Sequence, residues 1–224
     1  MGNKLVPKII LEGTRLTFKT DIAFKLNEHP EVTGKRKYRY HNPVVSGEWC
    51  GFTNTPWGRG LINFNPDEEA KAIATYNTWV TLFEQLRYYS WIVDRFHLST
   101  AMFQFLQHQR ELDFQWLEER LSRLNFRLIF LTRTAESFEA ARKERLKVSG
   151  NPKQYDDLTR FVREQEVLTQ LVKNSKLQSL TVDISDNNLE RAVESIAAWM
   201  KDTGGLTLED LPEDLFIGNS KYSC

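Results

Sequence analysis

The segment Lys8–Thr20 reads KIILEGTRLTFKT, and it sets the expected architecture of the whole chain. Lys8 to Glu12 form a short run rich in Ile and Leu that stops at Gly13, which is typical of a buried strand in a parallel sheet. From Thr20 to Asn27 the apolar residues then follow helical spacing. The segment therefore predicts a buried strand, a tight turn and a helix in immediate succession.

The turn from Gly13 to Thr20 matches the pattern G-x-x-x-x-G-K-[S/T], except that Phe18 stands where the pattern has its second glycine. In this pattern, backbone N–H groups at a helix N-terminus surround a phosphate, the lysine reaches its outer oxygens and the hydroxyl binds Mg²⁺. We therefore predict a phosphate-binding loop that includes Gly13, Thr14, Arg15, Phe18, Lys19 and Thr20. The alternative is that Lys19 and Thr20 only begin a helix.

Four further strands are predicted at residues 37–41, 90–94, 127–131 and 180–184. Helical patterns separate them, over residues 65–88, after Ser99 or Thr100, after Asp113, and over 134–148, 156–174 and 188–201. Strands joined through helices form a parallel sheet that is covered on both faces. We therefore predict an α/β protein with a three-layer α/β/α fold and five parallel strands, whose ligands bind beyond the carboxyl ends of the strands.

The composition limits the partners that we expect. The 224 residues include 30 Lys or Arg and 30 Asp or Glu, so no net charge attracts nucleic acid or an anionic membrane. No apolar run approaches the roughly 20 residues that span a bilayer, and the N-terminus lacks the apolar core of a secretory signal. We expect a cytoplasmic protein with one domain over residues 1–205 and an acidic tail over 206–224.

A second polar motif, Asp94-Arg95, ends the predicted strand that begins at Ser90. With the first motif, it makes the chain resemble the thymidylate-kinase and deoxynucleoside-kinase families, which have the P-loop NTPase architecture. The resemblance covers roughly residues 5–200 and is carried in chain order by Ile9–Gly13, Trp91–Phe96, Arg127–Leu131, Ala140–Arg145, Phe161–Glu164 and Thr181–Ser185.

The resemblance implies roles for the charged groups at these strand ends. Lys19 and Thr20 serve the donor phosphate and Mg²⁺, and Asp94 holds the water shell of the metal or orients the acceptor. Arg95 clamps the acceptor phosphate or the transferred phosphate, while Arg142 and Arg145 close over the donor from a lid at about residues 138–155. The alternatives are a plain salt bridge for Asp94-Arg95 and a solvated helix face for the two lid arginines.

The function implied by the resemblance is ATP-dependent phosphoryl transfer to a nucleoside, a nucleotide or a similar phosphate-bearing small molecule, with ATP and Mg²⁺ bound. The alternative is a catalytically degenerate kinase-like domain that binds a nucleotide or a protein partner without turnover. Phe18 favours the alternative, because a displacement of about 1 Å is enough to lower a rate about a hundredfold. The charged groups at two separate strand ends favour transfer.

The loop over residues 42–64 stands where these families bind the acceptor, and a loop of this length in a compact domain is usually functional. The predicted substrate-binding residues are Arg39, Trp49, Trp57, Arg59 and His97. The aromatic residues could equally pack the loop against the core. Asn42-Pro43-Val44 stands where deoxynucleoside kinases have Glu-Pro-Val, so an amide replaces their catalytic carboxylate, and Glu48 is the nearest substitute.

The resemblance also implies self-association, because proteins of this architecture commonly form dimers through the helices around the Asp-Arg strand. These helices correspond to residues 66–88 and 99–124 here. Trp79, Phe83, Phe103 and Phe105 are the candidate interface residues, although core packing would explain them equally well. A homodimer is therefore an expectation that the sequence leaves open.

Overall fold

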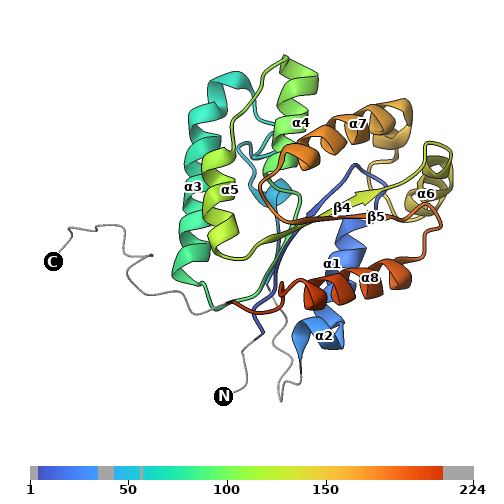
Figure 1. The fold of residues 1–224 in the computed structure, drawn as a ribbon. Helices are drawn as coiled ribbons and strands as arrows, with labels where there is room; N and C mark the ends of the chain where they lie inside the picture. The colour runs from blue at the N-terminus through green and yellow to red at the C-terminus, as the bar shows by residue number, and fades with distance from the viewer. Residues whose placement is uncertain (1–4, 35–42, 56–57, 209–224) are drawn as a thin grey trace.

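A computed structural model describes residues 5–34, 43–55 and 58–208 of the chain (Figure 1). The strand expected at residues 37–41 lies outside these ranges, as do Arg39 and Trp57. The strands are β1 (Lys8–Glu12), β2 (Val44–Ser46), β3 (Trp91–Asp94), β4 (Arg127–Thr132) and β5 (Ser179–Asp183). The helices are α1 (Lys19–Glu28), α2 (Pro30–Thr33), α3 (Glu69–Gln85), α4 (His97–His108), α5 (Gln115–Arg123), α6 (Ser137–Leu146), α7 (Thr159–Asn174) and α8 (Leu189–Asp202).

The five strands form one parallel sheet in the order β2-β3-β1-β4-β5. Strand β1 lies at its centre, where Ile10 pairs with Val93 on one side and with Leu128 on the other. All five residues of β1 are buried, which explains its uninterrupted apolar sequence. The turn after β1 is thereby held at the middle of the carboxyl edge of the sheet.

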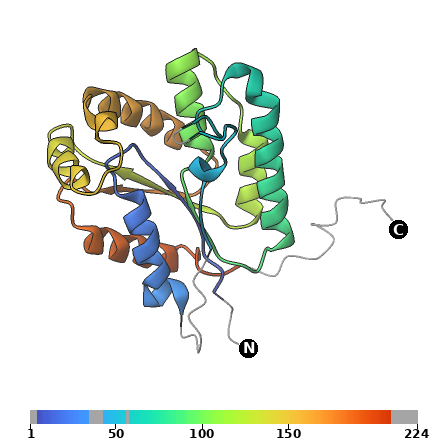
Figure 2. The same cartoon turned by 180° about the vertical axis from the view of Figure 1, so that it is seen from behind.

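Helices cover both faces of the sheet, as the two opposite views show (Figures 1 and 2). Ile10 belongs to the core formed with α3, α4, α5 and α7, whereas its neighbours Ile9 and Leu11 belong to the core formed with α1 and α8. Side chains alternate between faces along a strand, so β1, β2, β3 and β4 contribute to both cores, whereas β5 contributes Leu180 and Val182 to the core with α1 and α8. This arrangement confirms the predicted three-layer α/β/α fold with five parallel strands.

Helix α4 begins at His97, two to three residues earlier than the caps predicted from the sequence. Its N-terminus is capped from outside by the buried carboxylate of Glu12, at the end of β1. This carboxylate accepts hydrogen bonds from the backbone N–H groups of Phe96 (3.0 Å) and Ser99 (3.2 Å) and from the Ser99 hydroxyl. An anion at a helix N-terminus is stabilising, so Glu12 fixes the start of α4 beside the turn that follows β1.

The loop expected over residues 42–64 contains regular structure. It includes β2, a short 3-10 turn η1 (Gly47–Trp49) and an antiparallel bridge between Gly51 and Gly60. Buried α4 side chains hold its last part: Thr100 Oγ1 donates to the Leu61 carbonyl (3.0 Å), and Gln104 Nε2 donates to the Phe64 carbonyl (2.7 Å). The loop is therefore a packed part of the domain.

Two other features complete the fold. Leu206 is buried, and its carbonyl accepts a hydrogen bond from Val6 N–H (2.8 Å), so the first residue of the expected tail packs against the sheet. Phe83, one of the expected interface residues, lies in the core, whereas Phe105 is exposed. Among the described residues, no helix combines the length and the hydrophobicity that a membrane span requires.

Candidate functional site

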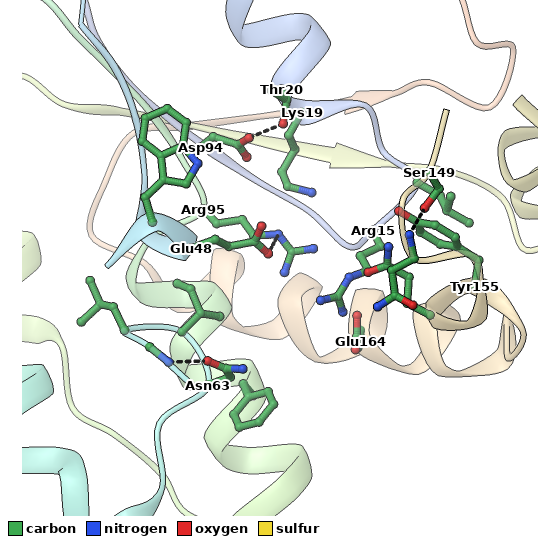
Figure 3. A pocket seen from close by; sticks show the side chains of 18 of the residues that line it. Arg15, Lys19, Thr20, Glu48, Asn63, Asp94, Arg95, Ser149, Tyr155 and Glu164 are labelled. Atoms are coloured by element: carbon green, nitrogen blue, oxygen red, sulfur yellow. Dashed lines mark hydrogen bonds and ion pairs between the residues drawn. The ribbon is translucent and has the colours of Figure 1, made fainter. Parts of the chain in front are cut away.

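A cleft of about 720 Å³ opens at the carboxyl edge of the sheet, next to the turn after β1 (Figure 3). Its walls are the start of α1, the loop around η1, the end of β3, the segment after α6 and the start of α7. The parallel sheet explains why these segments meet, because the carboxyl ends of its strands share one edge. The fold therefore brings the Gly13–Thr20 turn and the Asp94-Arg95 pair to one site.

The turn from Gly13 to Thr20 has an unusual backbone. Gly13, Leu16 and Phe18 have φ angles of 152°, 67° and 49°, and a Cβ atom on Gly13 would lie 2.7 Å from the Leu131 carbonyl oxygen. Within the described structure, no acceptor receives a hydrogen bond from the backbone N–H groups of residues 15 to 20. A run of free N–H groups that leads into a helix N-terminus provides a site for an anion.

Lys19 is the cation of this turn. Its ammonium is buried and donates to the Thr14 carbonyl (2.6 Å) and to Thr17 Oγ1 (3.2 Å), both within the turn. Burial and the neighbouring Arg95 guanidinium lower the pKa of Lys19 to about 7. The ammonium forms no ion pair with a described carboxylate, so an anion in the turn would supply the missing charge.

Thr20 and Asp94 join the turn to β3. Thr20 Oγ1 donates a hydrogen bond of 2.5 Å to Asp94 Oδ2. The other carboxylate oxygen, Asp94 Oδ1, is buried and has no hydrogen-bond partner among the described residues. A hydroxyl and a carboxylate with a free oxygen are ligands that a hard divalent cation prefers.

Arg95 extends this site along the cleft. Its backbone has a φ of 60°, its carbonyl accepts the Gly47 N–H (3.1 Å), and a Cβ atom on Gly47 would lie 2.7 Å from that carbonyl oxygen. Its Nε lies 3.3 Å from Glu48 Oε1, and this guanidinium keeps the pKa of the Glu48 carboxyl below its usual range. The close approach that Gly47 permits therefore sets the position of Glu48 against Arg95.

Phe18 takes the left-handed conformation that the glycine of the sequence pattern usually supplies. Its ring lies beside the guanidinium of Arg133 (5.5 Å from Cζ to the ring centroid) and packs against apolar clusters around α8 and α6. Arg133 is buried, and its guanidinium donates to Asn187 Oδ1 (2.9 Å) and to the Ser137 carbonyl (3.0 Å). Phe18 is thus anchored by packing at the edge of the cleft.

The conformation of Phe18 gives a test of this geometry. Replacing Phe18 with alanine should lower the free energy of unfolding by about 2 kcal/mol, because the packing of a partly buried ring is lost. Replacement with glycine should cost about 1 kcal/mol less than alanine, because glycine adopts the left-handed region without strain. Urea unfolding of both variants measures the difference.

A matched control lies in the same helix. Phe24 is half-exposed in the interior of α1, where glycine is less favourable than alanine by about 1 kcal/mol. The order of the glycine and alanine variants should therefore reverse between positions 18 and 24. The same order at both positions would contradict the left-handed conformation of Phe18.

The side of the cleft formed by the turn, the end of α6 and the start of α7 is rich in arginine. Arg15 has no hydrogen bond or ion pair through its guanidinium with any residue in the described ranges, and burial lowers its pKa. Among the described residues, the Arg145 guanidinium donates a single hydrogen bond, from Nε to the Tyr155 hydroxyl (3.3 Å), whereas Arg160 pairs with Glu164 (2.7 Å). Arg15, Lys19 and Arg145 are thus three cations that line one cleft and form no ion pair with a carboxylate in the described part of the chain.

The structure separates the residues predicted from the sequence. Arg15, Phe18, Lys19, Thr20, Asp94, Arg95 and Arg145 line the cleft, as do Trp49 and Arg59 at its edge. Arg142 does not; it lies near Glu139 (3.7 Å) and Asp156 (3.5 Å). His97 is not at the ligand edge either, because it is fully buried and its Nε2 lies 2.8 Å from Glu118.

Sequence reasoning missed Arg133, Arg160 and Glu164. Arg133 follows a buried strand, which was the one local signal for a position at the sheet edge. Arg160 and Glu164 stand four residues apart at the start of α7, a spacing that predicts a pair on one helix face. That face lies toward the cleft only because of how α7 packs.

Solved structures with a similar fold were found by comparison. The thymidylate kinase from Candida albicans has a TM-score of 0.59 at 15% identity, over 92% of this chain and 96% of that one. The YorR protein from Bacillus subtilis, in complex with phosphorylated GDP, has a TM-score of 0.58 at 17% identity, over 88% of this chain and 96% of that one. The deoxyadenosine kinase from M. mycoides, with bound dATP, has a TM-score of 0.52 at 12% identity, over 87% of this chain and 99% of that one.

No family model matches the sequence, and no curated protein is significantly similar to it. At identities of 12% to 17%, the structural likeness shows the fold. The chain has the P-loop nucleotide-kinase fold, as the resemblance of its sequence implied.

Proposed function

We propose that the protein transfers the γ-phosphoryl group of ATP to a small acceptor of the nucleoside or nucleotide type. The observation that carries the proposal is the set of Arg15, Lys19 and Arg145, which line one cleft and have no described carboxylate partner. Cations left unpaired in a partly buried cleft are costly unless an anion joins them. A polyphosphate lying along the free N–H groups of the turn supplies several such charges.

The roles of the residues follow from their places in the cleft. Lys19 and the turn would bind the outer phosphates of the donor, and Arg145 would reach them from the other wall. Arg95, between the turn and Glu48, would stabilise the charge that develops on the transferred group. Trp49, which is 67% exposed, would offer a flat surface to a ring of the acceptor.

The site also suits a magnesium ion. The unpartnered Asp94 Oδ1 and the adjacent Thr20 hydroxyl are oxygen ligands of the kind that Mg²⁺ takes, directly or through water. When bound, Mg²⁺ would neutralise charge on the donor phosphates.

Transfer from radiolabelled ATP tests the proposal, with nucleosides and nucleoside monophosphates offered one at a time as acceptors. We expect a labelled product with at least one acceptor and its loss when Mg²⁺ is removed. Failure of all acceptors, together with failure of ATP to bind, would overturn the proposal.

Phe18 favours a second candidate, a domain that binds a nucleotide without turnover. Phe18 is the residue immediately before α1, and it stands where the sequence pattern has its second glycine. A donor phosphate must approach the backbone closely at this position, and a bulky side chain hinders that approach. In that case ATP would bind and no acceptor would be labelled, and replacing Phe18 with glycine would restore transfer. We place this candidate second because the Phe18 ring is anchored against Arg133 and the two apolar clusters.

The low pKa of Lys19 predicts that ATP binding depends on pH. Phosphate needs the ammonium form, and the free protein loses this form as the pH rises through about 7. The affinity for ATP should therefore fall by up to about tenfold for each pH unit above neutrality, with uptake of a proton on binding. Calorimetry in buffers of different ionisation enthalpy measures this uptake. It should vanish in Lys19→Met, and a pH-independent affinity in the native chain would contradict the prediction.

A further inference from the structure

Leu16 connects the phosphate-binding turn to a small, separate part of the hydrophobic core. Its side chain is buried, with 6% exposed. The other buried members of this cluster come from α6, from the 3-10 turn η3 (Pro152–Tyr155) and from α7; they are Phe138, Ala141, Tyr155 and Phe161. None of these residues belongs to the two larger cores on the faces of the sheet. The turn therefore contributes an apolar side chain to the far side of the cleft.

The segment that rests on this cluster is residues 137–155, which comprises α6, η3 and the residues between them and is called the lid segment here. Phe138 and Ala141 are the buried residues of α6, and Tyr155 is the buried residue of η3. All three belong to the cluster that contains Leu16. The buried apolar contacts that hold the lid segment to the domain are therefore concentrated in one place.

Arg145 is placed at the cleft through the same contacts. Its Nε donates to the Tyr155 hydroxyl (3.3 Å). The Tyr155 ring lies inside the cluster, with its centroid 6.4 Å from that of Phe161. The position of the Arg145 guanidinium thus depends on the packing beneath the lid segment.

The backbone at Leu16 indicates that its side chain is needed there. Its φ angle of 67° lies in the left-handed region, which glycine and asparagine adopt with less strain than leucine. A leucine in this conformation costs free energy, and burial in the cluster offsets that cost. Phe18 has a similar backbone conformation and also packs against the cluster. The turn therefore combines an anion site on its backbone with an apolar anchor on its side chains.

We propose that Leu16 is a positioning residue, which anchors the lid segment to the phosphate-binding turn in the ligand-free protein and thereby holds Arg145 at the cleft. The anchoring is a property of the free protein, and only the role of Arg145 toward phosphate rests on the proposed function. A lid segment that is already ordered loses less conformational entropy when a polyphosphate binds. Arg145 therefore adds to the affinity without a further ordering step.

Hydrogen exchange of the free protein tests the anchor without any ligand. Leu16→Asn keeps a residue that tolerates the left-handed conformation and removes the apolar contact, whereas Leu16→Met keeps an apolar side chain. The α6 amides should exchange at least about tenfold faster in Leu16→Asn, because the lid segment opens more often, and within about twofold of the native rate in Leu16→Met. Leu16→Ala, which truncates the side chain without burying an amide, should also accelerate them.

Leu177→Ala is the matched control for this experiment. Leu177 is similarly buried (4% exposed), but it belongs to the core formed with α3, α4, α5 and α7. Its loss lowers the stability of the whole domain, and the α6 amides should keep their native exchange rates because they exchange through local opening of the lid segment. Equal acceleration of α6 in Leu177→Ala and Leu16→Asn, or none in Leu16→Asn and Leu16→Ala, would overturn the anchor.

Calorimetry with ATP and Mg²⁺ tests whether Leu16 acts through Arg145. Leu16→Asn should weaken binding at least about fivefold in the native background and less than about twofold in Arg145→Met, because the residue that it positions is then absent. Leu16→Met should bind ATP as the native chain does. An equal loss in both backgrounds would show that Leu16 acts on the turn itself, which contradicts the proposal. If the proposed function fails, the native chain does not bind ATP, whereas the exchange rates of α6 still show whether Leu16 anchors the lid segment.

Discussion

Replacing Lys19 with methionine should lower γ-phosphoryl transfer by about 10²- to 10³-fold, the loss typical of removing one preorganised charge from the reacting group. Methionine keeps the length and the apolar stem, so the buried site remains filled. The free energy of unfolding should not decrease, because the variant removes a buried ammonium that lacks a carboxylate partner. Steady-state transfer assays and urea unfolding of the same preparation separate the two effects.

Lys25→Met is the control for this variant. Lys25 lies in the same helix, and its exposed ammonium pairs with Glu190 (2.6 Å) away from the cleft. Its loss removes an equal charge and should change transfer by less than about twofold. Similar losses in the two variants would show that net charge, rather than the position of Lys19, determines the rate.

Replacing Asp94 with asparagine should be the next most damaging change, with transfer reduced by about 10²-fold at a fixed Mg²⁺ concentration. The amide can still accept the hydrogen bond from Thr20, so the link between the turn and β3 survives. The lost feature is the ionised oxygen Oδ1, to which no described residue donates a hydrogen bond. A higher Mg²⁺ concentration should therefore recover part of the activity.

The concentration of Mg²⁺ that gives half-maximal transfer is the measurement that isolates this role. It should rise about tenfold or more in Asp94→Asn. It should stay unchanged in Asp113→Asn, because Asp113 lies outside the cleft, where its Oδ1 accepts the Gln115 N–H (2.8 Å) at the start of α5, and an asparagine oxygen can accept the same hydrogen bond. An unchanged Mg²⁺ requirement in Asp94→Asn would show that Asp94 acts only through the Thr20 hydroxyl.

Local apolar patterns were enough to predict most of the fold. Strands β1, β3, β4 and β5 begin and end within about two residues of the predicted limits. Strands β1, β3 and β4 are largely buried and have nearly continuous apolar sequences, whereas β5 alternates Leu180 and Val182 with polar residues. Strand β2 is Val44–Ser46, within the segment that was predicted to be a loop. Its formation depends on pairing with β3, where Val44 lies opposite Ile92, and no pattern within residues 42–64 contains that information.

The candidate site was predictable only in part. The turn and Asp94-Arg95 follow strands in a parallel sheet, so topology alone brings them together. His97 could not be placed, because its partner Glu118 lies 21 residues away and decides that the ring is buried. The cap of α4 was missed for a similar reason, since Glu12 reaches Ser99 across 87 residues. Such contacts depend on packing between elements rather than on local sequence.

Titration of the native protein with ATP and Mg²⁺ by calorimetry tests the central claim most directly, which is that the Gly13–Thr20 turn and the Asp94-Arg95 pair form one phosphate-binding cleft. The account predicts saturable binding at a single site, with an affinity that falls about tenfold or more in Lys19→Met. An absence of heat up to about millimolar nucleotide, with the native chain folded, would contradict it.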